Sequence, residues 1–535
     1  MIFQYLAKRE PTKMSILFTN FSVTSIRRSA VRSVTRLTTS ILATGVLTSL
    51  AHADDISINQ PTPSDINSQI DQTNVAQNEL EKLNKQGSLA AQQIPTDANL
   101  PSEQDNQTRQ MTKAESLAYL AQHPEELEFI VASNVRSGNA DNLADLLPVY
   151  RQYPQRDPSL VQWGQAIIDA DQGNLDVAVA SYRELNAQFP NVKTLRFQMA
   201  MALLKNQQFN AAQSELEQLR TADEITNKDK EYLDTLLTAI KSRKEWSFYG
   251  NLSYVNNDNI NDNPPEGTDL GRGFKAGKRV AGTGVNYALT ADKRWPYDNN
   301  FFNSFSLGSY GTYYWDNKNY SDATVRASVG VGYLDNKKEL ELSTHLAKQF
   351  YGFGDKGDGD LHNYRTGKGI ELQGRYRLDD KWRYNASLGY SRGDYVEEYK
   401  NNDNQDVSFS HGLTYTPTPI TQLYAGMDVF VRDTDFDFNS FNRKGVRLGW
   451  GQVWPKGVAT YANVGYGYRQ YHGHDFFGDK RKNHEYTGSV SLWHRGLSFF
   501  NMTPKLVYSY KKVDSNAVRE ESKNQDVQLM LSTSF

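Results

Sequence analysis

Residues 323–333 read ATVRASVGVGY, and a similar alternation returns in WRYNASLGY at residues 382–390 and VQLMLSTSF at residues 527–535. A period of two puts successive side chains on opposite faces of a β-strand. The alternation starts at Trp246 and continues to Phe535. Strands of ~10–14 residues with one apolar face, one polar face and aromatic ends favour a membrane barrel with a wet interior over a soluble sandwich.

The connections between these strands alternate in length. Six short turns lie at residues 296–300, 335–337, 379–380, 417–419, 455–457 and 495–497. Seven longer polar loops lie at residues 256–277, 316–320, 352–363, 395–404, 434–441, 472–481 and 513–523. Thirteen connections predict fourteen antiparallel strands. Because this number is even, the start of the first strand and the end of the last strand lie on the same side of the membrane. Short turns mark the periplasmic side of such barrels.

The composition of the whole chain limits the class of protein. The 535 residues carry a net charge of −3 and no cysteine, and the mean hydropathy is −0.67. These values exclude a bundle of membrane helices, disulfides and thiol chemistry, and they give no electrostatic signature of nucleic-acid binding. Because 32 of 37 Gly, 25 of 31 Tyr and 7 of 8 Trp lie at or after Trp246, two different kinds of domain are joined.

The N-terminus has the pattern of an export signal. Four arginines between residues 27 and 36 precede the mostly apolar stretch 37–50, and Ala51-His52-Ala53 follows it. A basic region, a short apolar region and an A-x-A site are typical of a secretory signal peptide, so we expect residues 1–53 to be removed by cleavage after Ala53. Residues 54–110 are rich in Gln, Asn, Asp, Ser and Pro and are predicted to form a disordered spacer.

Residues 111–245 show a helical period and an internal repeat. Ala166 and Ala200 are 34 residues apart, as are Ala178 and Ala212. A 34-residue period with small residues at helix crossings is the tetratricopeptide pattern. We therefore predict an α+β multidomain protein in which an N-terminal α-helical tetratricopeptide array precedes a 14-stranded antiparallel transmembrane β-barrel at 246–535. The array either grips a polypeptide on a concave surface or acts as a rigid spacer.

Charged residues at inward positions of the predicted strands are candidates for the lumen lining. Fourteen strands enclose more space than the eight whose side chains can fill a barrel. The signs of these charges are mixed, which argues against a strongly ion-selective porin, and the alternative is that each serves a structural charge ladder across the barrel. The candidates are Arg326, Glu339, Glu341, Glu371, Arg375, Arg377, Asp428, Arg432 and Arg447.

Catalytic and metal sites are not expected. No G-x-S-x-G occurs, and no Ser/His/Asp or paired-carboxylate arrangement can be placed at a barrel rim. The sequence His472-Gly473-His474-Asp475 is the one local hint of metal, but it falls in a predicted surface loop. We therefore predict neither an enzyme nor a cofactor.

The order of export signal, repeats and fourteen-stranded barrel resembles the surface lipoprotein assembly modulators (Slam proteins), outer-membrane translocons of the type XI secretion family. Residues 246–254, the Asn-rich run 256–261 and Pro264-Pro265 are similar to that family's first strand and first loop. The resemblance implies that the barrel passes a partner protein to the cell surface. That cargo would be a surface lipoprotein or a soluble haem-binding protein, and no catalytic residues come with the family.

Other partners and functions follow from the same interpretation. An outer-membrane barrel is expected to contact outer-membrane lipids and to need the barrel assembly machinery and periplasmic chaperones, and no nucleic acid is expected. The N-terminal domain is predicted to lie in the periplasm. The alternatives are an exopolysaccharide exporter with repeats and a barrel, for which the array is short and the lumen mixed in charge, or a passive porin.

Overall fold

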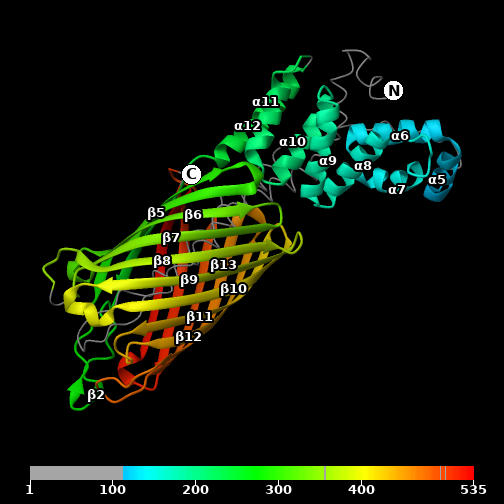
Figure 1. The fold of residues 1–535 in the computed structure, drawn as a ribbon. Coiled ribbons are helices and arrows are strands. Elements are labelled where there is room, and N and C mark those ends of the chain that lie inside the picture. Colours follow the sequence, from blue (N-terminus) through cyan, green and yellow to red (C-terminus); the bar gives the residue numbers. More distant parts are fainter. Residues whose placement is uncertain (1–111, 224, 355–356, 495, 501, 535) are drawn as a thin grey trace. The chain divides into compact units, whose positions relative to one another are not determined.

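The computed structural model describes residues 112–223, 225–354, 357–494, 496–500 and 502–534. These residues form two compact units, one mainly of residues 112–244 and one mainly of residues 245–535 (Figure 1). The predicted signal peptide and spacer lie outside the described residues. None of the described helices is long and apolar enough to cross a membrane.

The first unit consists of eight consecutive described helices. They are α5 Lys113–Gln122, α6 Pro124–Ser137, α7 Ala140–Tyr150, α8 Pro158–Asp171, α9 Leu175–Gln188, α10 Lys193–Lys205, α11 Phe209–Arg220 and α12 Asn227–Arg243. Local residues fix several ends: Asp157 caps α8 through the backbone N–H groups of residues 159 and 160, and Gly138 ends α6 with φ of 70°. The structure thus confirms the predicted tetratricopeptide helices.

Small residues allow these helices to pack closely. Ala166, Ala178, Ala200 and Ala212 are all fully buried at the crossings, as their 34-residue spacing predicts. A buried polar link adds to this core, because the indole Nε1 of Trp163 donates to the side-chain oxygen of Gln198 at 2.6 Å. The amide nitrogen of the same glutamine donates to the carbonyl of residue 135 at 2.9 Å. α8, α10 and α6 are therefore joined at one point.

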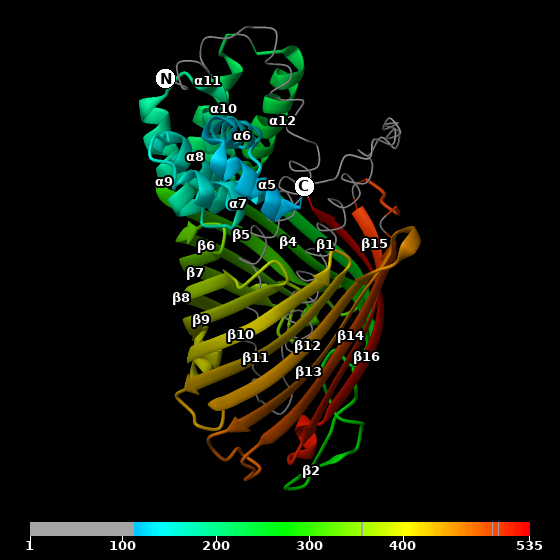
Figure 2. The same cartoon turned by 90° about the vertical axis from the view of Figure 1, so that its right-hand side faces the viewer.

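The second unit is a closed barrel of fourteen antiparallel strands, as predicted (Figure 2). The order around the barrel is β1, β16, β15 and so on down to β4, which pairs with β1. The strands are β1 Ser247–Asn257, β4 Gly282–Pro296, β5 Phe301–Tyr314, β6 Asp322–Leu334, β7 Lys338–Tyr351, β8 His362–Arg377, β9 Trp382–Tyr395, β10 Asn404–Thr418, β11 Thr421–Thr434, β12 Phe441–Val453, β13 Val458–Tyr471, β14 Lys482–His494, β15 Met502–Ser515 and β16 Ser522–Ser534.

Two connections differ from the predicted ones. The first loop contains a small hairpin, β2 Asp269–Gly271 and β3 Phe274–Lys275, whose strands are too short to show an alternation. The connection after β14 is longer than expected, since β15 begins only at Met502, and residues 499 and 502 exchange backbone hydrogen bonds of 2.9 and 2.8 Å. The strand count is unaffected.

The outer surface of the barrel is apolar. Val325, Val329 and Val331 on β6 are each more than 40% exposed, and Leu340 and Leu342 on β7 are about half exposed. Aromatic rings collect at the short-turn end, where Trp246 lies with its centroid 6.5 Å from that of Trp295. An apolar band bordered by aromatic residues is typical of barrels in the outer membrane.

Candidate functional site

The inner face of β4, β5, β7 and β8 carries a network of ion pairs near the short-turn end. A guanidinium nitrogen of Arg294 lies 2.8 Å from Glu339 and 3.1 Å from Glu341. Arg375 donates to Glu339 at 2.8 Å, and the Ser304 hydroxyl donates to Glu341 at 2.6 Å. Since β5 and β6 separate β4 from β7, Arg294 links strands that are not neighbours.

A second network lies near the long-loop end, on β11 to β14. Arg443 stands between two carboxylates, with its nitrogens 2.5 Å from Asp428 and 2.7 Å from Glu485. Arg447 gives Asp428 a second partner at 3.1 Å, and Arg469 does the same for Glu485 at 2.8 Å. The side chains of these five residues are between 3% and 22% exposed, so their charges are balanced mainly by one another.

A bidentate pair belongs to the same half of the wall. Arg432 donates through two nitrogens to the two carboxylate oxygens of Asp406, at 2.9 and 3.0 Å. Both side chains are below 5% exposed, and Arg365 approaches the same carboxylate to 3.7 Å. Two parallel charge-assisted bonds fix the guanidinium in orientation as well as in distance.

The residues predicted to line the lumen can now be placed. Arg326 lies 3.6 Å from Glu371, and Arg377 lies half-buried at the end of β8. The other members of the prediction belong to the two networks or to the bidentate pair; they are Glu339, Glu341, Arg375, Asp428, Arg432 and Arg447. Their mutual pairing favours the structural charge ladder.

Six partners in these networks were not among the predicted residues. They are Arg294, Arg365, Asp406, Arg443, Arg469 and Glu485. The alternation could have found them, since Arg443 and Arg447 are four residues apart on one strand and so share a face. The alternation could not predict the partner of each residue on another strand.

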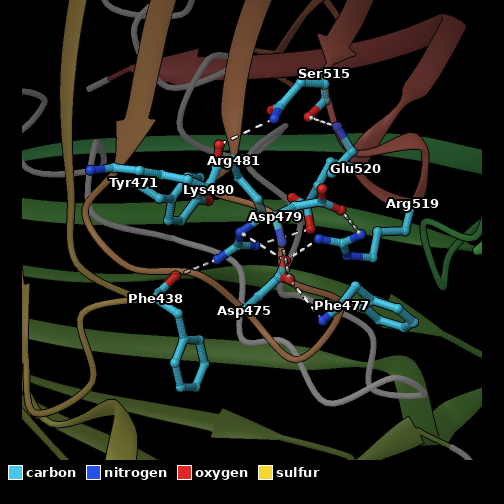
Figure 3. Close-up of polar contacts among 12 residues, drawn as sticks. Phe438, Tyr471, Asp475, Phe477, Asp479, Lys480, Arg481, Ser515, Arg519 and Glu520 are labelled. Atoms are coloured by element: carbon cyan, nitrogen blue, oxygen red, sulfur yellow. Dashed lines mark hydrogen bonds and ion pairs between the residues drawn. The ribbon is translucent and has the colours of Figure 1, made fainter. Parts of the chain in front are cut away.

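The long loops form a separate polar cluster (Figure 3). Arg481, in the β13–β14 loop, donates to the carbonyl of Phe438 in the β11–β12 loop at 2.7 Å and to Glu520 in the β15–β16 loop at 3.0 Å. Arg519 donates to Asp475, which brings the β13–β14 and β15–β16 loops together a second time. The Arg481 side chain is only 1% exposed. Three loops are thereby joined through one buried arginine.

The hairpin in the first loop packs on this cluster through aromatic contacts. The ring centroid of Phe274 lies 5.8 Å from that of Phe476 and 5.9 Å from that of Phe477. Arg272 lies over the Phe476 ring at 5.0 Å, and Arg519 lies over the Phe477 ring at 4.5 Å. The first loop and the β13–β14 loop are therefore in direct contact.

The run 472–475 contributes Asp475 to the loop cluster, where its carboxylate accepts a hydrogen bond from Arg519. Within the described part of the chain, no group of three or more His, Cys, Asp or Glu is arranged to hold a metal ion.

Comparison with known proteins identifies both units. The sequence model of the surface lipoprotein assembly modifier family matches residues 246–535, and the model of its N-terminal TPR repeats matches residues 114–216. The chain is 34% identical over 404 residues to surface lipoprotein assembly modifier 2 of Haemophilus influenzae, covering 75% of this chain and 83% of that protein. It is 33% identical over 437 residues to surface lipoprotein assembly modifier 1 of the same species, covering 81% and 89%.

A more distant relative is named as a secretion modulator rather than as a lipoprotein assembly modifier. The chain is 22% identical over 391 residues to the hemophilin secretion modulator of Acinetobacter baumannii, covering 69% of this chain and 77% of that protein. Since the barrel model spans more than half of the sequence and the repeat model matches the helices before it, the chain belongs to the surface lipoprotein assembly modifier family.

Proposed function

We propose that this protein is an outer-membrane translocon that delivers a partner protein to the cell surface or the medium, without catalysing a reaction. The observation that carries the proposal is the joining of a tetratricopeptide-type helical domain to a closed fourteen-stranded barrel, the arrangement of the family to which the chain belongs. The names of the relatives give the cargo class: a surface lipoprotein or a secreted protein of the hemophilin kind.

The inner wall of the barrel suits a polypeptide better than a charged polymer. Its arginines and carboxylates are paired with each other, as at Arg443 between Asp428 and Glu485. An exopolysaccharide exporter would instead be expected to present an excess of one charge to its polymer. A passive porin has no evident use for the helical domain.

The chain connectivity supports one orientation of the protein in the membrane. β1 begins at Ser247, which pairs with Asp292 close to the short turn that follows β4. Short turns mark the periplasmic side, so the helical domain that precedes β1 belongs in the periplasm, where it would collect cargo. The barrel itself would face outer-membrane lipids and depend on the barrel assembly machinery and periplasmic chaperones for insertion.

Co-expression tests the export function. The protein encoded next to this chain would be epitope-tagged and produced with and without it in a Gram-negative host. We expect the tag to reach the surface or the medium only when this chain is present. Equal export without it, or intracellular retention in both cases, would contradict the proposal.

Tags within this chain test its orientation. An epitope inserted in the first loop at residues 256–277, or in the β13–β14 loop at residues 472–481, should be labelled on intact cells. An epitope near Gln207, in the helical domain, should be labelled only after the outer membrane is permeabilised. The reverse pattern would invert the proposed orientation.

A further inference from the structure

The barrel is closed by an unusually short strand pairing. β1 and β16 pair over five residues, from Tyr249 opposite Ser534 to Ser253 opposite Met530. On its other side β1 pairs with β4 over eleven residues, from Ser247 to Asn257. The β7–β8 ladder has fourteen residue pairs. The seam between β1 and β16, defined by this pairing, is therefore less than half as long as those ladders.

The missing part of the seam lies toward the long loops. If the register of the five pairs continued, Tyr254 would face Leu529 and Asn257 would face Asp526. Among the described residues no such pairs form, although both segments are in extended strands. An unpaired strand edge offers a row of backbone donors and acceptors to another chain, and within a membrane such groups are costly to leave unsatisfied.

Side chains along both parts of the seam are poorly satisfied as well. Asn251, Ser253 and Gln528 are all less than 5% exposed. In the described structure the side-chain oxygens Oδ1, Oγ and Oε1 of these residues have no hydrogen-bond partner, and neither has the hydroxyl of Thr533. A buried polar atom without a partner destabilises the structure around it, because its lost hydrogen bond to water is not replaced. The paired part of the seam is therefore weakly stabilised, and the part nearest the long loops is unpaired.

The first loop crosses the open part of the seam. Asp262 accepts a hydrogen bond of 3.4 Å from Asn524 on β16, and farther along the loop Phe274 packs against Phe476 and Phe477. Since β15 and β16 stand between β1 and β14 in the barrel, the loop spans both of them. Loop contacts hold this end of the seam in place of backbone pairing.

We propose that the half of the β1–β16 seam nearest the long loops, residues 254–257 of β1 and 526–529 of β16, is a docking edge for an extended segment of the exported polypeptide, which adds as a β-strand. This inference rests on the proposed function for the nature of the partner. Strand addition fits because the groups left free are those of the backbone, and main-chain hydrogen bonds supply the affinity in that mode of recognition. Departure of the first loop from the seam exposes the edge.

The geometry of the seam can be tested without cargo. The chain has no cysteine, so pairs of introduced cysteines report only on their own positions. In the purified barrel, Leu252→Cys with Leu531→Cys should oxidise readily, because these residues are paired. Tyr254→Cys with Leu529→Cys should oxidise much more slowly. Equal rates for the two pairs would show that the ladder extends through the gap and would overturn the inference.

Locking the seam tests its part in export. The Tyr254→Cys/Leu529→Cys variant, driven to its disulfide by prolonged oxidation, closes the open edge and should lose export of the tagged neighbouring protein, and a reductant should restore it. The control is Leu342→Cys with Leu372→Cys, a lipid-facing pair in the complete β7–β8 ladder, which should export equally well when oxidised or reduced. If wild type exports and the variant with the closed edge exports just as well, the edge does not take up the cargo and the inference fails, whereas absence of export by wild type would refute the proposed function instead.

Cross-linking tests the docking itself. A photo-reactive amino acid in place of Asn256, at the open edge, should capture the tagged cargo during export. The control replaces Asn442, an exposed asparagine that lies, like Asn256, near the long-loop end of its strand but is paired on both sides. Capture at Asn256 and not at Asn442 supports strand addition. Equal capture at both positions, or at neither while export proceeds, would overturn it.

Discussion

Arg443 provides the sharpest test of whether the charges on the inner wall hold the barrel together. Its side chain is 15% exposed, and its guanidinium nitrogens lie 2.5 Å from Asp428 and 2.7 Å from Glu485, whose side chains are 3% and 11% exposed. Replacement by alanine would leave two largely buried carboxylates, each with one remaining arginine. Breaking a buried ion pair from one side costs about 3–5 kcal/mol, and the remaining partners place the expected loss at the lower end of that range.

The assay is unfolding of the barrel in urea in lipid vesicles, followed by the heat-modifiable band in gels. Arg443→Ala should lower the free energy of unfolding by about 3 kcal/mol. Lys444→Ala is the matched control, since this neighbour is also positively charged but exposed on the outer face, and its loss should change stability by less than about 1 kcal/mol.

A double-mutant cycle separates the ion pair from other effects. Arg443→Ala combined with Glu485→Ala should destabilise less than the sum of the single substitutions, with a coupling of about 0.5–3 kcal/mol. If Arg443→Ala unfolds at the same urea concentration as wild type, the network is not a source of stability. If it is stable but fails to export cargo, the residue contacts cargo and the structural interpretation is wrong.

Three further outcomes are expected. Arg519→Ala removes the contact with Asp475 and should make the β13–β14 loop a protease target on intact cells, whereas Lys480→Ala in the same loop should not; equal resistance of both variants would count against the loop cluster. Ala178→Leu places a larger side chain at a fully buried helix crossing and should destabilise the helical domain by about 1–3 kcal/mol in thermal melts followed by circular dichroism, while Ala180→Leu at an exposed position of the same helix should not; equal melting temperatures would contradict the packing described. Deletion of residues 111–244 should leave a heat-modifiable barrel, because the barrel strands pair only with one another, but should abolish cargo export; unchanged export would reduce the array to a spacer.

The fold could be predicted from the sequence because its signals are local. Alternation along each strand and the lengths of the connections predict fourteen strands, and the 34-residue spacing of Ala166 and Ala200 predicts paired helices. The ion pairs could not be predicted, since they depend on the register between strands: Arg294 meets Glu341 across two intervening strands. The short β1–β16 ladder could not be predicted from the sequence either, because Tyr254 and Leu529 continue the alternation of their strands whether or not those strands pair.

The order of strands around the barrel has a consequence for how the protein is made. Apart from the seam, each strand of the barrel pairs with its nearest barrel neighbour in the sequence, so these pairings need only local hairpins. The seam joins residues 249–253 to residues 530–534, the two extremes of the domain. Until the last strand is in place, β1 has no partner on one side and the barrel cannot close. Closure is therefore a late and non-local event in biogenesis, and truncation of even the final strand should leave a chain that cannot complete its insertion.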